Sequence, residues 1–179
     1  KFSHMVMGPT CGLILADLGA DVVKVEPAPG GDKTRRLPGS GAGYFGTYNR
    51  NKRSISVNLK SVEGLKFATH LVRESDVLIE NFGVGVLDRL GLGFDAMQEI
   101  NPSLVYCALK GFLSGPYEQR AALDEVVQMM GGLAYMTGSE GCPLRAGASV
   151  NDVMGGLFGV IAIQAALWER QRTGKGTFV

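Results

Sequence analysis

The sequence has few cysteines, almost no net charge and only short uninterrupted apolar runs. Its three cysteines, Cys11, Cys107 and Cys142, do not have the number or spacing of a disulfide framework or a zinc site. The 18 basic residues balance 17 acidic ones to a net charge of +1, which excludes a polybasic nucleic-acid binder and an acidic disordered chain. The longest apolar stretch, residues 153–167, is shorter than the about 20 residues that span a bilayer, and we expect it to form a buried helix. We therefore expect a cytoplasmic protein with no metal site and no nucleic-acid or membrane partner.

Strand-like and helix-like patterns alternate along the first 110 residues. Alternating or β-branched apolar runs predict strands at 2–7, 21–26, 53–58, 76–80 and 104–109. Apolar residues at helical spacing predict helices at 10–18, 62–72 and 94–100, followed by two long helices at 124–135 and 152–172. This order indicates βαβ units, so we expect an α/β fold with a mostly parallel sheet and flanking helices. Because the chain opens and stops in apparent strands, we expect a fragment of a longer polypeptide.

One loop-rich segment, residues 21–60, carries an excess of positive charge. Residues 21–60 hold eight lysines and arginines against three acids, and residues 27–46 are rich in glycine and proline. Arginine side chains and free backbone N–H groups both suit phosphate oxygens, so the segment favours a phosphate-bearing ligand. A solvated basic face would explain the same charge. The glycine-rich turns at 8–12 and 39–43 lack the spacing of a dinucleotide-binding or Walker loop.

Two carboxylates stand near expected helix starts. Asp152 begins a strongly apolar helix with Gly155 and Gly156 in its first turn, and Asp124 begins the preceding helix. Capping and the helix dipole alone explain a carboxylate at such a position. Glycines there cost helix propensity, which is reasonable if a bulky group must approach that end of the helix. From the residues alone, Asp152 is either a helix cap or a site carboxylate.

A series of short motifs follows in a fixed order from residue 2 to residue 179. The motifs are Gly8-Pro9, Leu-Ala-Asp-Leu-Gly-Ala-Asp-Val-Val-Lys-Val-Glu at 15–26, Gly31-Asp32 with Arg35, Asn-Arg-Asn-Lys-Arg-Ser at 49–54, Glu-Asn-Phe-Gly at 80–83, Leu-Asp-Arg at 87–89 and Arg-Gln-Arg-Thr-Gly-Lys-Gly at 170–176. In this combination the chain resembles the family III CoA-transferases, which include formyl-CoA transferase, carnitine CoA-transferase and α-methylacyl-CoA racemase. The resemblance implies that residues 1–179 form a single Rossmann-like portion of the large domain of a longer chain, in an interlocked homodimer.

The resemblance also implies a binding site for coenzyme A, as a substrate and not as a permanently bound cofactor. Arg35 and Lys60 would meet the nucleotide phosphates. Asn81 and Phe82 would hold the adenine and pantetheine region, and Arg89 would add a further charge contact. This placement agrees with the basic segment found independently at residues 21–60.

The catalytic aspartate of the family corresponds to Asp152. It would attack an acyl-CoA thioester and carry CoA to a free carboxylic acid through an aspartyl-CoA thioester, which replaces one difficult step by two easier ones. We expect the helix N-terminus to keep Asp152 ionised, and N–H groups near Gly155 and Gly156 to stabilise the oxyanion. Asp124 occupies an acidic position that helps to orient the acyl groups in the transferase branch.

Two departures from the family pattern bear on the substrate. The racemase branch has a histidine where this chain has Leu123, and racemisation needs that second acid–base group, so it is disfavoured. The formyl-CoA branch has a glutamine at Val6 and a tyrosine at Leu123, which makes formate and oxalate unexpected as substrates. The alternatives to a transferase are an acyl-CoA racemase or epimerase of the same family and a CoA-binding fragment without catalysis.

Overall fold

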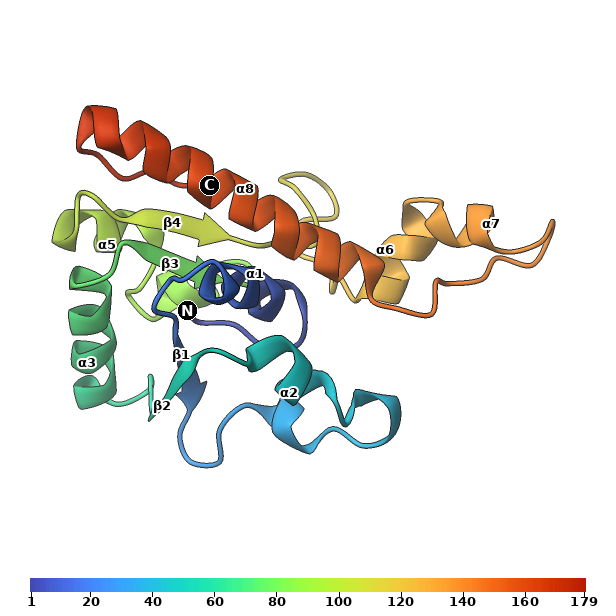
Figure 1. Ribbon diagram of the computed structural model, residues 1–179, viewed down its shortest axis with the longest axis horizontal. Coiled ribbons are helices and arrows are strands. Elements are labelled where there is room, and N and C mark those ends of the chain that lie inside the picture. Colours follow the sequence, from blue (N-terminus) through green and yellow to red (C-terminus); the bar gives the residue numbers. More distant parts are fainter.

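The computed structural model describes residues 1–179, except for the side chain of Ser40, as a mixed α/β fold (Figure 1). Strand β1 (Val23–Pro27) pairs in parallel with β2 (Arg53–Val57), and β3 (Val77–Glu80) pairs in parallel with β4 (Val105–Ala108). The start of the chain lies between the two pairs. The N–H of Val25 donates to the carbonyl of Lys1 (3.0 Å), and the N–H of Phe2 donates to that of Ile79 (2.7 Å). All strands therefore end at one edge, as βαβ connections predict.

Both faces of the strands are covered, so the protein has two hydrophobic cores. Successive residues of a strand point alternately into one core and the other. Leu78 and Tyr106 belong to one buried cluster, whereas Ile79, Val105 and Cys107 belong to the other. This follows from the period of two along a strand, which sends successive side chains to opposite faces. A strand that is buried on both faces reads as a continuous apolar run, as β3 and β4 do in the sequence.

Helices cover each face. The first core is closed by α3 (Val62–Arg73), α4 (Val86–Arg89) and α5 (Phe94–Ile100), and the second by α1 (Met7–Asp17) and α8 (Val150–Thr173). The remaining helical segments are the 3₁₀ turns Lys33–Arg36 and Gly39–Gly41, α2 (Tyr44–Asn49), α6 (Asp124–Met130) and α7 (Leu133–Thr137). Figure 1 shows α8 running across the molecule, with α6 and α7 projecting beyond its N-terminal end. The predicted α/β fold with parallel strands and flanking helices is confirmed.

Two predicted elements are wrong in their boundaries. Residues 2–7 do not form a strand: Phe2 alone bridges to Glu80, and α1 already begins at Met7. The predicted helix at 124–135 is two helices, because Gly132 between them has a φ of 82°, which a continuing right-handed helix cannot contain. The other predicted strands and helices are found within about two residues, the usual uncertainty of element ends, except α1, which begins at Met7 and not at residue 10.

Close packing explains the glycines near the start of α8. A Cβ at Gly156 would lie 2.8 Å from the carbonyl oxygen of Met7, and one at Gly159 would lie 2.7 Å from the side chain of Leu109. These positions must be small so that α8 can approach α1 and the end of β4. The expectation that the glycines make room for a bulky ligand is therefore wrong for Gly156.

The apolar helix α8 is buried on only one face. Gly156, Val160, Ile163 and Ala166 are buried, whereas other large apolar side chains of the helix are open to solvent: Met154, Leu157, Phe158 (63%), Ile161 (61%) and Trp168 (70%). The expectation of a buried helix therefore holds for one face of α8 only. By length and composition α8 would also suit a membrane span, a property that it shares with core helices of soluble proteins.

Candidate functional site

Asp152 and Asp124 lie in the wall of the same small cavity. The cavity measures about 200 Å³, and its wall also contains Tyr44, Asn81 and Arg145. The two carboxylates meet because α6 and α8 both begin here. The backbone N–H of Asp152 donates to Oδ1 of Asp124 at 3.0 Å, which joins the two helix starts across 28 residues of sequence. The structure therefore brings together the two carboxylates that the sequence suggested.

Asp152 lies in the first turn of α8, whose N-cap residue is Ser149. Its side chain makes no hydrogen bond to any other described residue, so it is not a helix cap and its oxygens are free to react. Burial, followed by the charges of Asp124 and Glu125, raises the pKa of Asp152 to about 6. Desolvation and like charges thus outweigh the helix dipole in the shift, but a group with this pKa is still mostly ionised near pH 7.

Asp124 is held by the cavity wall itself. Its Oδ2 accepts from the side-chain amide of Gln128, one turn further along α6, and its Oδ1 accepts from Asp152. Gln128 is fully buried, and its Oε1 accepts from the N–H of Ala146 at 2.7 Å. Asp124 therefore positions the backbone of Asp152, and Gln128 fixes Asp124 together with the segment that precedes α8.

The predicted oxyanion donors are not available. Gly155 and Gly156 lie beyond the first turn of α8, where each N–H belongs to the helix's own hydrogen-bond ladder. Only the first four N–H groups of a helix lack such partners, and that of Asp152 is already bonded to Asp124.

A larger cavity of about 880 Å³ opens at the carboxyl ends of β1 and β2. This is the edge at which parallel α/β sheets bind ligands. Three exposed cations line it, Lys33, Lys60 and Arg89, and none of them forms an ion pair with another described residue. Phe82 adds an aromatic surface. Lys60, Phe82 and Arg89 thus lie together, as the resemblance implied.

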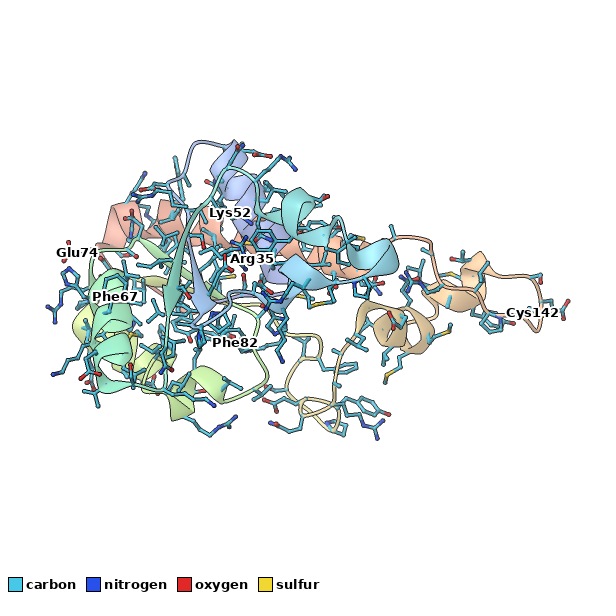
Figure 2. The ribbon with its side chains drawn as sticks, turned by 90° about the horizontal axis from the view of Figure 1, so that it is seen from below. Arg35, Lys52, Phe67, Glu74, Phe82 and Cys142 are labelled. Carbon is cyan, nitrogen blue, oxygen red and sulfur yellow. The ribbon has the colours of Figure 1, made fainter. Side chains whose placement is uncertain are left out.

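Arg35 does not line this cavity. Its guanidinium forms a two-pronged ion pair with the buried Glu26, with Nε–Oε2 at 2.8 Å and Nη2–Oε1 at 2.7 Å, and it stacks on Phe45 at 3.8 Å. Burial raises the pKa of Glu26, but hydrogen bonds from Arg35, Ser54 and the backbone of Asp32 outweigh it and lower the pKa to about 2. Arg35 lies against the body of the molecule in Figure 2. It therefore supports the loop that follows β1 and does not present a free cation.

Asn81 lies in the smaller cavity, not in the larger one. Its side chain holds the backbone of His4 on both sides: Oδ1 accepts from the N–H, and Nδ2 donates to the carbonyl, each at 3.0 Å. The ring of His4 stacks on Phe82 with the centroids 5.6 Å apart. His4 and Met5 line both cavities, so the two spaces share one wall.

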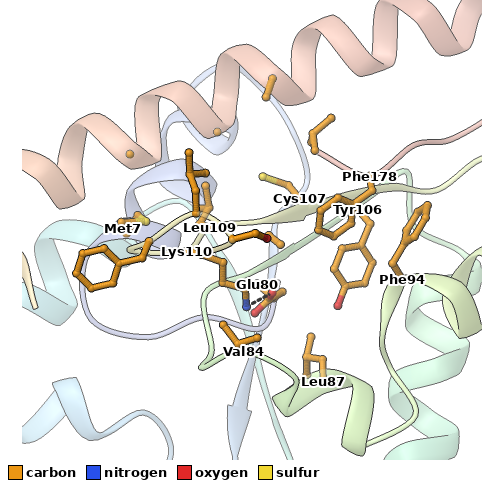
Figure 3. A pocket seen from close by; sticks show the side chains of 18 of the residues that line it. Met7, Glu80, Val84, Leu87, Phe94, Tyr106, Cys107, Leu109, Lys110 and Phe178 are labelled. Carbon is orange, nitrogen blue, oxygen red and sulfur yellow. Dashed lines mark ion pairs between the residues drawn. The ribbon is translucent and has the colours of Figure 1, made fainter. Parts of the chain in front are cut away.

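An ion pair between the buried Glu80 and the partly exposed Lys110 supports the backbone of Phe82. Lys110 pairs with Glu80 in a third, mainly apolar cavity of about 580 Å³ beneath α8 (Figure 3). Lys110 also donates to the carbonyl of Phe82 at 2.8 Å, and Glu80 accepts from its N–H at 2.8 Å. Both backbone groups of Phe82 are thereby fixed beside the larger cavity.

Four residues of the site were not predicted from the sequence: His4, Tyr44, Gln128 and Arg145. The spacing of Gln128, four residues after Asp124, was a usable signal, because residues at i and i+4 share a helix face. His4, Tyr44 and Arg145 reach the site through contacts between segments that are distant in the sequence, and no local sequence pattern shows such contacts.

Comparisons with known proteins place the whole chain in one family. Residues 1–179 match the CoA-transferase family III. A formyl-CoA:oxalate CoA-transferase of Streptomyces coelicolor is 48% identical over 179 residues, which cover 97% of this chain and 43% of the relative. A formyl-CoA:oxalate CoA-transferase of Rhodopseudomonas palustris is 45% identical, over 98% of this chain and 42% of the relative. The chain thus spans less than half the length of these curated relatives.

Solved structures extend the likeness to the fold. A CAIB/BAIF family protein from Brucella suis superposes with a TM-score of 0.92 at 43% identity, over 99% of this chain and 50% of that one. Rv3272 from Mycobacterium tuberculosis superposes with a TM-score of 0.91 at 33% identity, over 99% of this chain and 51% of that one. The match in sequence runs the full length of the chain, and the chain belongs to CoA-transferase family III.

Proposed function

We propose that this chain forms the CoA-binding and nucleophile-bearing part of a CoA-transferase, which moves CoA from an acyl-CoA to a free carboxylic acid. The observation that carries the proposal is the shared wall of His4 and Met5 between the two cavities. A ligand whose phosphates meet Lys60 and Arg89 in the larger cavity can extend its thioester past this wall towards Asp152. Family membership supports CoA as that ligand.

The chemistry begins at the free carboxylate of Asp152. It attacks the thioester carbonyl and expels CoA thiolate, which leaves a mixed anhydride. The thiolate then attacks the aspartyl carbonyl, releasing the donor acid and forming an aspartyl-CoA thioester. The acceptor carboxylate attacks that thioester in turn, and the returning thiolate takes the acceptor acyl group and frees Asp152. Each step exchanges one acyl bond for another, so no oxidant or external base is consumed.

The cavity wall bears on the acyl group that is carried. Val6 and Leu123, which replace the glutamine and tyrosine of the formyl-CoA branch, both lie in the wall of the smaller cavity. Met5, Met7 and Leu109 add further apolar surface. We therefore propose an acyl group with an apolar portion rather than formyl or oxalyl.

We further propose that the complete protein is an interlocked homodimer. The exposed apolar face of α8 supports this, because single domains rarely leave so large an apolar stripe open to water.

Peptide mass spectrometry tests the central proposal. The complete natural polypeptide that contains this chain would be incubated with a panel of short-chain acyl-CoAs and digested. We expect the mass of CoA on the peptide that contains Asp152, and no adduct in the Asp152→Asn variant. Normal turnover by Asp152→Asn, or CoA binding without an adduct from any donor, would contradict the proposal and favour a binding-only protein or a racemase.

A further inference from the structure

The smaller cavity has an unusual balance of charge for a site that must accept an acid anion. Three carboxylates line it: Asp124, Glu125 and Asp152. His4 is also in the wall, but burial lowers its pKa, so it stays neutral near pH 7. Among the described residues of the wall, Arg145 is therefore the single side chain with a permanent positive charge. An incoming carboxylate meets repulsion from every other charged group there.

Arg145 is held in place by its neighbours rather than by its own guanidinium. The N–H of Leu144 donates to the carbonyl of Ala134 at 2.9 Å, and the N–H of Ala146 donates to Gln128 at 2.7 Å. The same glutamine side chain anchors Asp124. The backbone on both sides of Arg145 is thus tied to α6 and α7, and on the α6 side to the same Gln128 that fixes Asp124, so the backbone of Arg145 has a defined position in the cavity wall.

The guanidinium itself is only weakly engaged. Its Nη1 lies 3.4 Å from Oε2 of Glu125, and both side chains are about half exposed, so the pair is long, single-pronged and open to water. Its Nε donates to the carbonyl of Ala146 at 3.1 Å. Such exposed pairs contribute little to stability, and a carboxylate that binds an arginine in two-pronged fashion replaces them readily.

We infer that Arg145 binds the carboxylate of the free acid acceptor, and that Glu125 competes for the same guanidinium in the empty site. This inference rests on the proposed transferase function. The acid exchanges its hydration for the Arg145 fork and so approaches the aspartyl thioester despite the acidic wall. The acyl-CoA donor brings no free carboxylate, so its entry and its attack by Asp152 do not need Arg145, whereas the donor acid formed later leaves past the same guanidinium.

The test separates the two half-reactions in the complete polypeptide. In Arg145→Gln we expect the KM for the acceptor acid to rise at least tenfold, while the amount of CoA adduct formed on Asp152 from acyl-CoA alone stays at the wild-type level. In Glu125→Gln we expect the opposite sign, a lower acceptor KM, because the competing carboxylate is gone. Arg145→Lys should recover part of the loss, since it keeps the charge but not the fork.

Three outcomes would overturn the inference. They are an unchanged acceptor KM in Arg145→Gln, a parallel loss in both Arg145→Gln and Glu125→Gln, which would indicate a merely structural ion pair, and a loss of adduct formation in Arg145→Gln. Each of these comparisons requires that the wild type forms the CoA adduct on Asp152. If the wild type forms none, the proposed function itself fails, and the two failures are therefore distinguishable.

Discussion

Asp152 combines two properties that oppose each other at the scale of a single residue. Its carboxylate is free of hydrogen bonds to the described residues, as a nucleophile requires, but the environment that keeps it free also disfavours its charge. Burial and the charges of Asp124 and Glu125 raise its pKa to about 6. A carboxylate with a raised pKa is a stronger nucleophile once it is ionised, and it is still mostly ionised at neutral pH.

This raised pKa predicts an acid limit for the transfer reaction. Because only the ionised form attacks, kcat/KM should be level above pH 7 and fall about tenfold per pH unit below about 6. Measurement of initial rates from pH 4.5 to 8 checks this. In Glu125→Gln the limit should move to lower pH, since one of the charges that raise the pKa is removed; an acid limit near pH 4 in the wild type would contradict the assignment.

The same environment predicts a cost in stability. The folded state favours protonated Asp152, so its stabilising contribution is present below the ordinary pKa near 4 and is lost as the pH rises through about 6. At pH 8 the Asp152→Asn variant should therefore be more stable than the wild type, by about 1–2 kcal/mol after allowing for partial exposure. Urea unfolding at pH 8 and pH 4.5 checks this, and most of the gain should be lost at the lower pH.

At the scale of elements, the contact between α1 and α8 depends on missing side chains. We expect Gly156→Ala to lower the free energy of unfolding by about 1–3 kcal/mol, because its Cβ would lie 2.8 Å from the backbone carbonyl of Met7, which cannot move aside. Gly155→Ala is the matched control. Its Cβ would meet only the flexible side chain of Met7 at 3.1 Å, and the gain in helix propensity offsets that contact. Thermal unfolding of both variants compares them; equal losses would show that the close packing is not the cause.

At the scale of the whole molecule, cations from separate segments meet in the larger cavity. Lys60→Ala and Arg89→Ala should each weaken CoA binding about 5–30-fold, in proportion to a lost charge-assisted hydrogen bond, and leave the binding of pantetheine, which lacks the phosphates, nearly unchanged. Isothermal titration calorimetry checks both ligands.

Arg35→Ala should instead destabilise the fold by about 2–3 kcal/mol, because it leaves the buried Glu26 without its partner. An effect of Arg35→Ala confined to CoA affinity would show that our assignment of this arginine to the scaffold is wrong.

The exposed face of α8 gives a second prediction at this scale. Replacing Phe158 and Ile161 by glutamate should convert the proposed dimer of the complete protein to monomers, because both side chains are about 60% exposed here and would be covered by a partner. Arg172→Ala, on the exposed polar end of the same helix, is the control and should remain dimeric. Sedimentation velocity measures the mass of each, and a monomeric wild type would contradict the proposal.

The sequence by itself determined the elements and much of the chemistry. Periodicity of two and 3.6 residues located the four strands and the longer helices but not α2, because backbone geometry and burial act over a few neighbouring residues. The position of Asp152 at a helix start and the ordered motifs indicated both the family and the candidate nucleophile. The basic segment at 21–60 indicated an anionic ligand without any reference to relatives.

Only the tertiary structure decided which of those groups are free to act. Arg35 and Lys60 are equally basic in the sequence, but the fold pairs Arg35 with Glu26 and leaves Lys60 open at the cavity. The pKa of Asp152 and the nearness of Arg145 likewise depend on where α6 and the segment before α8 lie. Charge interactions and desolvation depend on distance in space and on burial, and neither is fixed by separation along the chain.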